Sequence, residues 1–191
     1  MKLDWNDSIP PTAANKWYAL NQALAAVVYA CSITCDGHVG TQLICAKSKM
    51  APLKLITIPI LELAEGTLLV KLVTHILKSL NHQSIPIHLW TDSSIAHTWI
   101  ANHSSRWKDF VHNRVCYIQE SLPQAKWGLV PGYENPTDLA TRGMSPIQLS
   151  EQLSWWKGPS WLSQLVHQWP QQSPSTSTME FLEEQKTTLL Y

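Results

Sequence analysis

The spacing of hydrophobic residues changes along the chain, and the changes predict alternating strands and helices. The run 25–34 is rich in β-branched residues, and a turn at Asp36-Gly37 separates it from a similar run at 39–47. These two runs predict a β-hairpin. The preceding residues, 12–26, have apolar side chains at helical spacing and predict a short amphipathic helix that overlaps the start of the hairpin.

Further along, three helices and a strand are predicted. A long helix from Pro59 to Leu80 follows from its apolar periodicity, because proline is tolerated in a first helical turn. A short helix is predicted just after Asp92, another over 106–120, and a strand over 126–130. The residues predicted to be buried on these helices are Leu61, Ala64, Leu68, Leu72, Ile76 and Leu80, then Ile95, Ala96, Trp99 and Ile100, then Phe110, Val111, Val115 and Ile118.

The change of period at Thr91-Asp92-Ser93 is the centre of this pattern. An apolar, β-favouring run from Ile85 to Trp90 stops at Asp92, and helical spacing begins beyond it. Asp92 is therefore expected at the carboxyl end of a strand, where open α/β sheets place their ligand sites. The alternative is that Asp92 or Ser93 merely caps the following helix.

Two other carboxylates occupy comparable positions. Glu62 is expected in the first turn of the long helix, and Asp138 in the first turn of a short helix that follows Pro136. If Glu62, Asp92 and Asp138 converge, their mutual repulsion implies a hard divalent cation such as Mg²⁺, and without metal at least one pKa should be raised. We predict that they meet at the carboxyl end of the Asp92 strand. The alternative is that Glu62 is not a ligand and only stabilises the helix, because a negative charge near a helix N-terminus interacts favourably with the helix dipole.

Composition limits the remaining possibilities. The 191 residues, 45% of them hydrophobic, suffice for one cored domain with extensions, and the formal net charge of zero gives no overall signature of a nucleic-acid binder. Cys31, Cys35, Cys45 and Cys116 lack metal-site spacing and are interpreted as reduced packing residues. No signal peptide or membrane span is recognisable, so an intracellular protein, cytoplasmic or nuclear, is expected.

Several motifs together resemble a known family. They are the stretches 46–53 (AKSKMAPL), 57–63 (TIPILEL), 90–93 (WTDS), 106–115 (RWKDFVHNRV), 130–143 (VPGYENPTDLATRG) and 155–162 (WWKGPSWL). In this order they resemble the ribonuclease-H-like region of Pao/Bel-type LTR retrotransposon Pol polyproteins. The resemblance extends over about residues 24 to 169, and in such polyproteins an integrase region for DNA integration is expected further on.

The resemblance implies a fold and a chemistry. It implies an α/β, ribonuclease-H-like mixed sheet flanked by helices, which binds an RNA–DNA hybrid and cuts the RNA with two Mg²⁺ or Mn²⁺ ions held by four carboxylates. By position, Glu62, Asp92 and Asp138 match the second, third and fourth of these. The first carboxylate has no counterpart, because residues 17–20 contain none. We therefore expect a shortened or incomplete first strand, one bound ion or none, and impaired catalysis.

The resemblance also implies a division of the chain. Residues 1–23 form a lead-in segment and short helix joined across a deletion, and residues 24–143 form the ribonuclease-H-like domain. A Trp-rich extension, 144–169, and a disordered linker or tail, 170–191, follow. The side chain nearest the missing aspartate is expected from 17–23 and not to be acidic. Tryptophans of the extension are expected to pack over a domain edge, the alternative being stacking on bases.

Basic residues provide an alternative function. On a chain of zero net charge, Lys47, Lys49, Lys54, Arg106, Lys108, Arg114 and Arg142 could line one face and bind nucleic acid without catalysis. A plainer interpretation of the lysines at 47–54 is that they form a charged strand edge that discourages pairing with other chains. Likewise, the plainer interpretation of Arg106, Lys108 and Arg114 is that they simply form the solvent-exposed face of the 106–120 helix.

Overall fold

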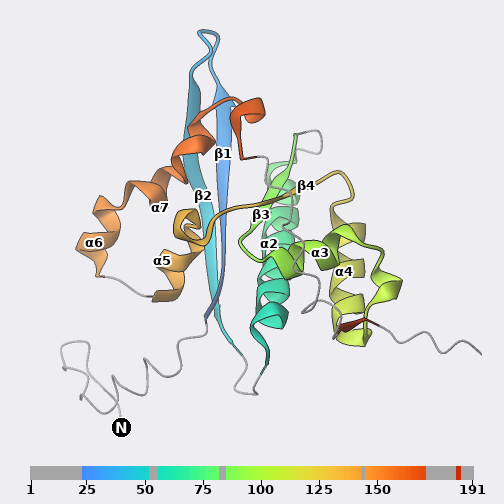
Figure 1. Ribbon diagram of the computed structural model, residues 1–191. Helices are drawn as coiled ribbons and strands as arrows, with labels where there is room; N and C mark the ends of the chain where they lie inside the picture. The colour runs from blue at the N-terminus through green and yellow to red at the C-terminus, as the bar shows by residue number, and fades with distance from the viewer. Residues whose placement is uncertain (1–22, 52–55, 82–84, 143–144, 171–183, 186–191) are drawn as a thin grey trace, which may run out of the picture.

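Four strands form two separate two-stranded sheets beside a long helix (Figure 1). The computed structural model describes residues 23–51, 56–81, 85–142, 145–170 and 184–185. Strand β1 (Ala23–Ile33) pairs antiparallel with β2 (Val39–Met50), and β3 (His88–Thr91) pairs parallel with β4 (Lys126–Leu129). This confirms the prediction of a mixed α/β fold with an incomplete sheet.

The β1–β2 hairpin forms as predicted, with one correction at its start. Its turn places Gly37 at a φ of 82°, a left-handed conformation that glycine adopts without steric cost. Strand β1 begins at Ala23, so the prediction that a helix continues to Ala26 is wrong for residues 23–26. Their pairing with β2 and the burial of Leu24, Ala25 and Ala26 override a weak helical preference. The rest of that predicted helix, 12–22, lies outside the described residues.

Helix α2 (Ile58–Leu80) confirms the predicted long helix but not its predicted buried stripe. Leu63 and Val70 are fully buried, whereas Leu80 is 52% exposed. The stripe differs because α2 packs on two sides, against β1 and against helix α4 (Asp109–Ser121), instead of along one face. Ala64, Leu68 and Ile76 are only half-buried, while Leu61 and Leu72 are buried as predicted.

The two following helices complete the main core. Helix α3 (Ser94–Ala101) buries Ile95, Ala96, Trp99 and Ile100 as predicted, and a 3-10 turn, η1 (Ser104–Arg106), leads into α4. Val111, Val115 and Ile118 are buried, but the prediction for Phe110 is wrong. Phe110 is 38% exposed and packs against the Arg114 guanidinium, which lies 3.3 Å from the ring centroid, instead of entering the core.

Strand β3 separates two hydrophobic layers, because successive side chains point to opposite faces. Leu89 joins the core formed with α2, α3 and α4, whereas Trp90 joins a second cluster with Trp161 and Trp169. We call Trp90, Trp161 and Trp169 the tryptophan cluster; its ring centroids lie 4.7 to 6.2 Å apart. Gly128 on β4 leaves the space that the Trp90 ring occupies.

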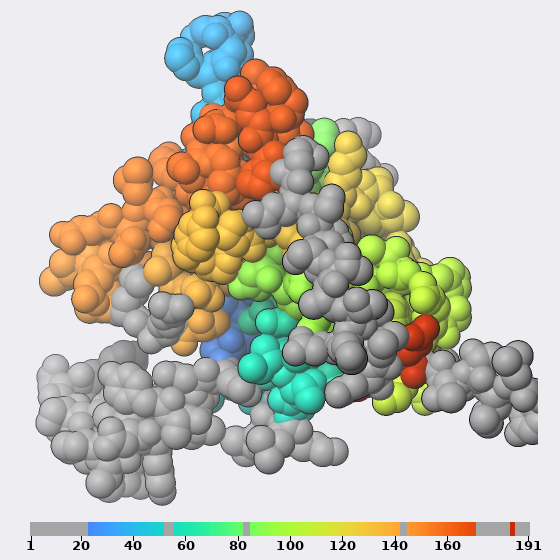
Figure 2. All heavy atoms as spheres, viewed as in Figure 1, coloured from blue at the N-terminus to red at the C-terminus, as the bar shows by residue number. Residues whose placement is uncertain are grey.

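The C-terminal extension packs across the hairpin. It comprises α6 (Pro146–Glu151), α7 (Leu153–Lys157), η3 (Ser160–Ser163) and η4 (Val166–Gln168), and Figure 2 shows it in orange below the protruding hairpin tip. The Tyr29 hydroxyl donates to the Trp155 carbonyl at 2.9 Å. Trp155, Trp161 and Trp169 are buried, which confirms packing over a domain edge for these three; Trp156 is 41% exposed.

Other details differ from expectation. Glu184 and Gln185, inside the predicted disordered tail, instead pair with the loop before α4: the Lys108 amide donates to the Glu184 carbonyl at 2.8 Å, and Gln185 bridges to Trp107. The four cysteines are free thiols, but none is buried, so they are not packing residues of the core. Among the described helices, none has the length and apolarity to cross a membrane.

Candidate functional site

Asp92 lies directly after β3, as predicted, and it does not cap the next helix. Ser93 does so, because its Oγ accepts the Ala96 amide at 3.1 Å. One Asp92 carboxylate oxygen, Oδ2, instead accepts the side-chain amide of Asn135 at 3.0 Å. Asn135 follows the 3-10 turn η2 (Gly132–Glu134) and also accepts the amide of Thr137, at 3.2 Å. The loop between β4 and helix α5 (Thr137–Arg142) is thereby fixed against Asp92.

Glu62 lies one residue beyond the first turn of α2, because the helix begins at Ile58 instead of Pro59. The helix dipole therefore explains its position less well than expected, since the effect fades beyond that turn. Its side chain is half-buried. Burial raises the Glu62 pKa, a hydrogen bond from Ser93 lowers it, and the negative charge of Asp92 raises it further.

The structure adds a carboxylate that the sequence analysis did not select. Glu65, one turn beyond Glu62, accepts the main-chain amide of Ala25 on its Oε1 at 3.4 Å. Its pKa is raised to about 7, first by burial and then by the charges of Asp92, Glu62 and Asp138, against the lowering effect of the Ala25 hydrogen bond. Asp138 lies in the first turn of α5, as predicted.

These four carboxylates are therefore electrostatic neighbours. We call Glu62, Glu65, Asp92 and Asp138 the acidic end. The pKa values of Glu62 and Glu65 are raised first by burial, and the charges of the neighbouring carboxylates add to this effect. Glu65 reaches the start of β1 through its hydrogen bond with the Ala25 amide. The expectation of a non-acidic side chain from 17–23 beside the missing aspartate falls almost entirely outside the described residues. Of that segment only Ala23 lies within the described residues.

The acidic end offers the carboxylate oxygens that hard cations prefer as ligands, but these carboxylates are not arranged to coordinate one. Within the described ranges, no group of three Asp, Glu, His or Cys side chains is close enough to hold a metal ion. Two of the carboxylates are already engaged by Asn135 and by the Ala25 amide. The arrangement therefore provides negative charge at the sheet edge without a formed coordination set.

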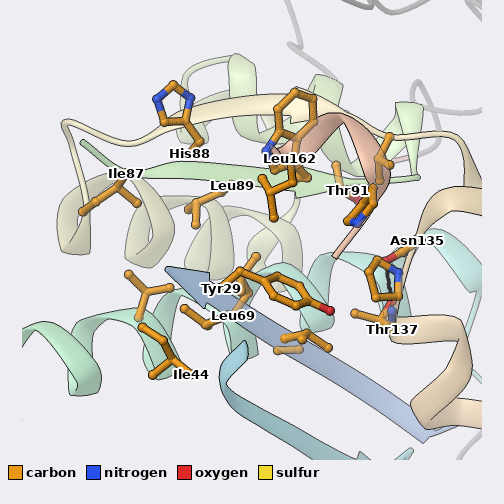
Figure 3. Close-up of a pocket in the computed structure, with 18 of the residues that line it drawn as sticks. Tyr29, Ile44, Leu69, Ile87, His88, Leu89, Thr91, Asn135, Thr137 and Leu162 are labelled. Atoms are coloured by element: carbon orange, nitrogen blue, oxygen red, sulfur yellow. Dashed lines mark hydrogen bonds between the residues drawn. The ribbon is translucent and has the colours of Figure 1, made fainter. Parts of the chain in front are cut away.

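A cavity of about 490 Å³ extends from the acidic end between the two sheets (Figure 3). Its two sides are β1 and β3, and the inner face of α2 closes it below with Gly66, Leu69 and Val73. Trp161 and Leu162 close it from the other face. We call this cavity the cleft. It is lined mainly by apolar side chains, and Glu62, Glu65 and Asp92 also line it, where β1 begins and β3 ends.

The basic residues do not form one surface. Lys47 and Lys49 are exposed on β2, whereas Arg106 and Lys108 are exposed next to α4, and the two groups lie on opposite sides of α2 in Figure 1. Arg114 is half-buried against Phe110. Lys54 lies outside the described residues, and of Arg142 only the backbone position in α5 is described.

The antiparallel hairpin, the parallel strand pair and the long helix beside them are consistent with a ribonuclease-H-like fold with an incomplete sheet. Residues 18–93 match a family model described as the Pao retrotransposon-like RNaseH-like domain. This match supports an RNase-H-like domain of the Pao retrotransposon kind, and it includes Glu62 and Asp92 but not Asp138. No curated protein and no solved structure matches the chain.

Proposed function

We propose that this chain is a fragment of a Pao/Bel-type retrotransposon Pol polyprotein whose domain derives from two-metal endonucleases that cut RNA in RNA–DNA hybrids. Glu62, Asp92 and Asp138 are the remaining catalytic and metal-binding positions. Catalysis is impaired because the first aspartate is missing, and the site holds one Mg²⁺ or Mn²⁺ ion, or none.

One observation carries this proposal. The charges of Glu62, Asp92 and Asp138 all act on one side chain, Glu65, although dozens of residues separate them along the chain. Capping or dipole compensation does not require these three charges to lie near one side chain, and the capping role belongs to Ser93. The family match independently supports the fold in which such carboxylates meet.

A hybrid-cleavage assay tests the proposal. The purified chain is incubated with a labelled RNA–DNA hybrid in Mg²⁺ or in Mn²⁺, and Asp92→Asn serves as the matched variant. We expect cleavage by the wild type to be indistinguishable from that by Asp92→Asn. Robust cleavage that Asp92→Asn abolishes would show that the site is assigned correctly but that catalysis is not impaired. Robust cleavage that survives Asp92→Asn would contradict both the assigned site and the impairment.

The second candidate is a non-catalytic nucleic-acid-binding or interaction module. Its support is the exposure of Lys47, Lys49, Arg106 and Lys108, but their placement on two sides of α2 offers no single basic face. Binding through such residues should weaken steeply with salt, because phosphate neutralisation releases counterions. A binding isotherm measured at two salt concentrations tests this candidate, since hybrid binding that does not depend on salt would exclude it.

A further inference from the structure

The two strands that border the cleft both present unpaired edges to it. Within the described residues, β1 is hydrogen-bonded only to β2, and β3 only to β4. An edge strand carries a row of amide and carbonyl groups that can accept another strand. Here two such rows face each other across one apolar cavity.

The peptide groups that face the cleft can be assigned. The Ala25 amide points away from β2 toward Glu65, so by the alternation of a strand Val27 and Tyr29 also direct their amides to the cleft. On the other side, the carbonyls of Ile87 and Thr91 accept amides from the β4 side. The intervening residues, His88 and Trp90, therefore direct their peptide groups toward β1.

The cleft is also covered on both faces. The inner side of α2 contributes Leu69 and Val73 below, and Trp161 and Leu162 lie above. Side chains of a strand placed there would alternate between these two apolar layers, as Leu89 and Trp90 of β3 already do. The volume of about 490 Å³ lies in the range of pockets that bind ligands, roughly 300–1,000 Å³.

The two ends of the cleft differ in charge. The acidic end lies at the start of β1 and the end of β3, because Glu65 contacts Ala25 and is affected by Asp92. At the opposite end, His88 lies near the positive charge of Lys126. A ligand with a positive group at the acidic end is therefore the complementary one.

We propose that the cleft binds an extended peptide segment of a partner protein as an added strand between β1 and β3. The segment is apolar in its middle and carries a lysine or arginine at its carboxyl end. This direction follows because the strand then runs antiparallel to β1, the longer edge, and antiparallel pairing is slightly more stable per residue. The proposal does not depend on nuclease ancestry.

Peptide binding to the full chain tests the proposal. The probe is a capped eight-residue peptide of alternating valine and threonine that ends in lysine. Three control peptides carry glutamate in place of the lysine, the lysine at the amino end, or a central proline that removes one amide. We expect the glutamate and reversed peptides to bind at least fivefold more weakly, and the proline peptide to show no measurable binding.

Amide hydrogen exchange gives the second readout. With the probe bound, exchange at Val27, Tyr29, His88 and Trp90 should slow at least tenfold, because these alternate amides face the added strand and, unlike the Ala25 amide, have no acceptor in Glu65. Val27→Pro removes a cleft-facing amide that does not pair with β2, so it should weaken probe binding at least fivefold while the circular dichroism spectrum is retained.

Three results would overturn the proposal. One is equal binding of the proline peptide, and another is probe binding without slower exchange at these amides. The third is slow exchange of the four amides before any peptide is added, which would show that residues of this chain already fill the cleft.

Discussion

The carboxylate of Glu65 lies 3.4 Å from the main-chain nitrogen of Ala25, a residue forty positions earlier in the chain. A side chain on a helix thus takes the place that a neighbouring strand's carbonyl would occupy at this edge of β1. The same carboxylate has a pKa near 7, because it is buried and lies near three other acids.

This position makes the stability of the fold depend on pH. The folded pKa of about 7 exceeds the ordinary value of 4.5, so native stability is lost as pH rises through that interval. Glu65→Gln keeps an acceptor for Ala25 and removes the charge. It should raise the free energy of unfolding by about 2 kcal/mol at pH 8, and by almost nothing at pH 4, in urea titrations.

The control for this prediction is Glu151→Gln, which removes the same charge from an exposed position on α6. It should leave stability nearly unchanged at both pH values. An equal effect of Glu65→Gln at pH 4 and pH 8 would contradict the assignment of the charge effect to Glu65.

The hydrogen bond between Asn135 and Asp92 predicts a second measurable loss. Asn135→Ala removes this bond and also the acceptor for the Thr137 amide at the start of α5. We expect a loss of about 1 kcal/mol in unfolding free energy, measured in urea. Asn113→Ala, at an exposed position of α4, is the matched control and should change stability by less than half as much.

Gly128 offers a test of the packing between β3 and β4. A Cβ atom at this position would lie 2.5 Å from the Trp90 ring, which is itself held by Trp161 and Trp169. Gly128→Ala should therefore cost about 2 kcal/mol, because the new methyl group forces the ring to shift away from its contacts with Trp161 and Trp169. Gly132→Ala is the control, since its Cβ meets only Asp92, at 3.8 Å; similar losses from both variants would refute this packing argument.

Two tryptophans of the C-terminal extension should behave differently. Trp161 is buried against Trp90, and its indole nitrogen donates to Glu134 at 2.8 Å. Trp161→Ala should lower the unfolding free energy by about 3 kcal/mol, as large-to-small changes in a core do. Trp156→Ala, at a site 41% exposed, should cost less than about 1 kcal/mol in the same thermal or urea unfolding experiment. The reverse order would contradict the assigned packing.

Sequence patterns predicted the elements better than their contacts. The extent of α2, the presence of α3 with its buried residues and the position of Asp92 followed from periodicity, since these depend on neighbours along the chain. The buried side of α2 did not, because a helix between β1 and α4 buries two sides, and a single-stripe rule assumes one.

The carboxylates show the same limit. Glu62 and Asp138 stand out by their places near the starts of predicted helices, whereas Glu65, one turn further along its helix, has no such local signal. Its role depends on Ala25, which no local pattern connects to it. Asn135 had a local signal, the Asn-Pro-Thr-Asp turn, but its bond to Asp92 required the fold.

The separation of the two sheets has a consequence for cooperativity. Within the described residues, no peptide hydrogen bond of a strand ladder crosses from β1–β2 to β3–β4. The two halves are coupled instead by packing of α2 and α5 against β1, by Glu65 and by the tryptophan cluster. A single unfolding transition in a calorimeter would then depend on side-chain packing alone. Loosening the tryptophan cluster should separate the melting of the hairpin from that of the helical half, because nothing in the backbone obliges them to melt together.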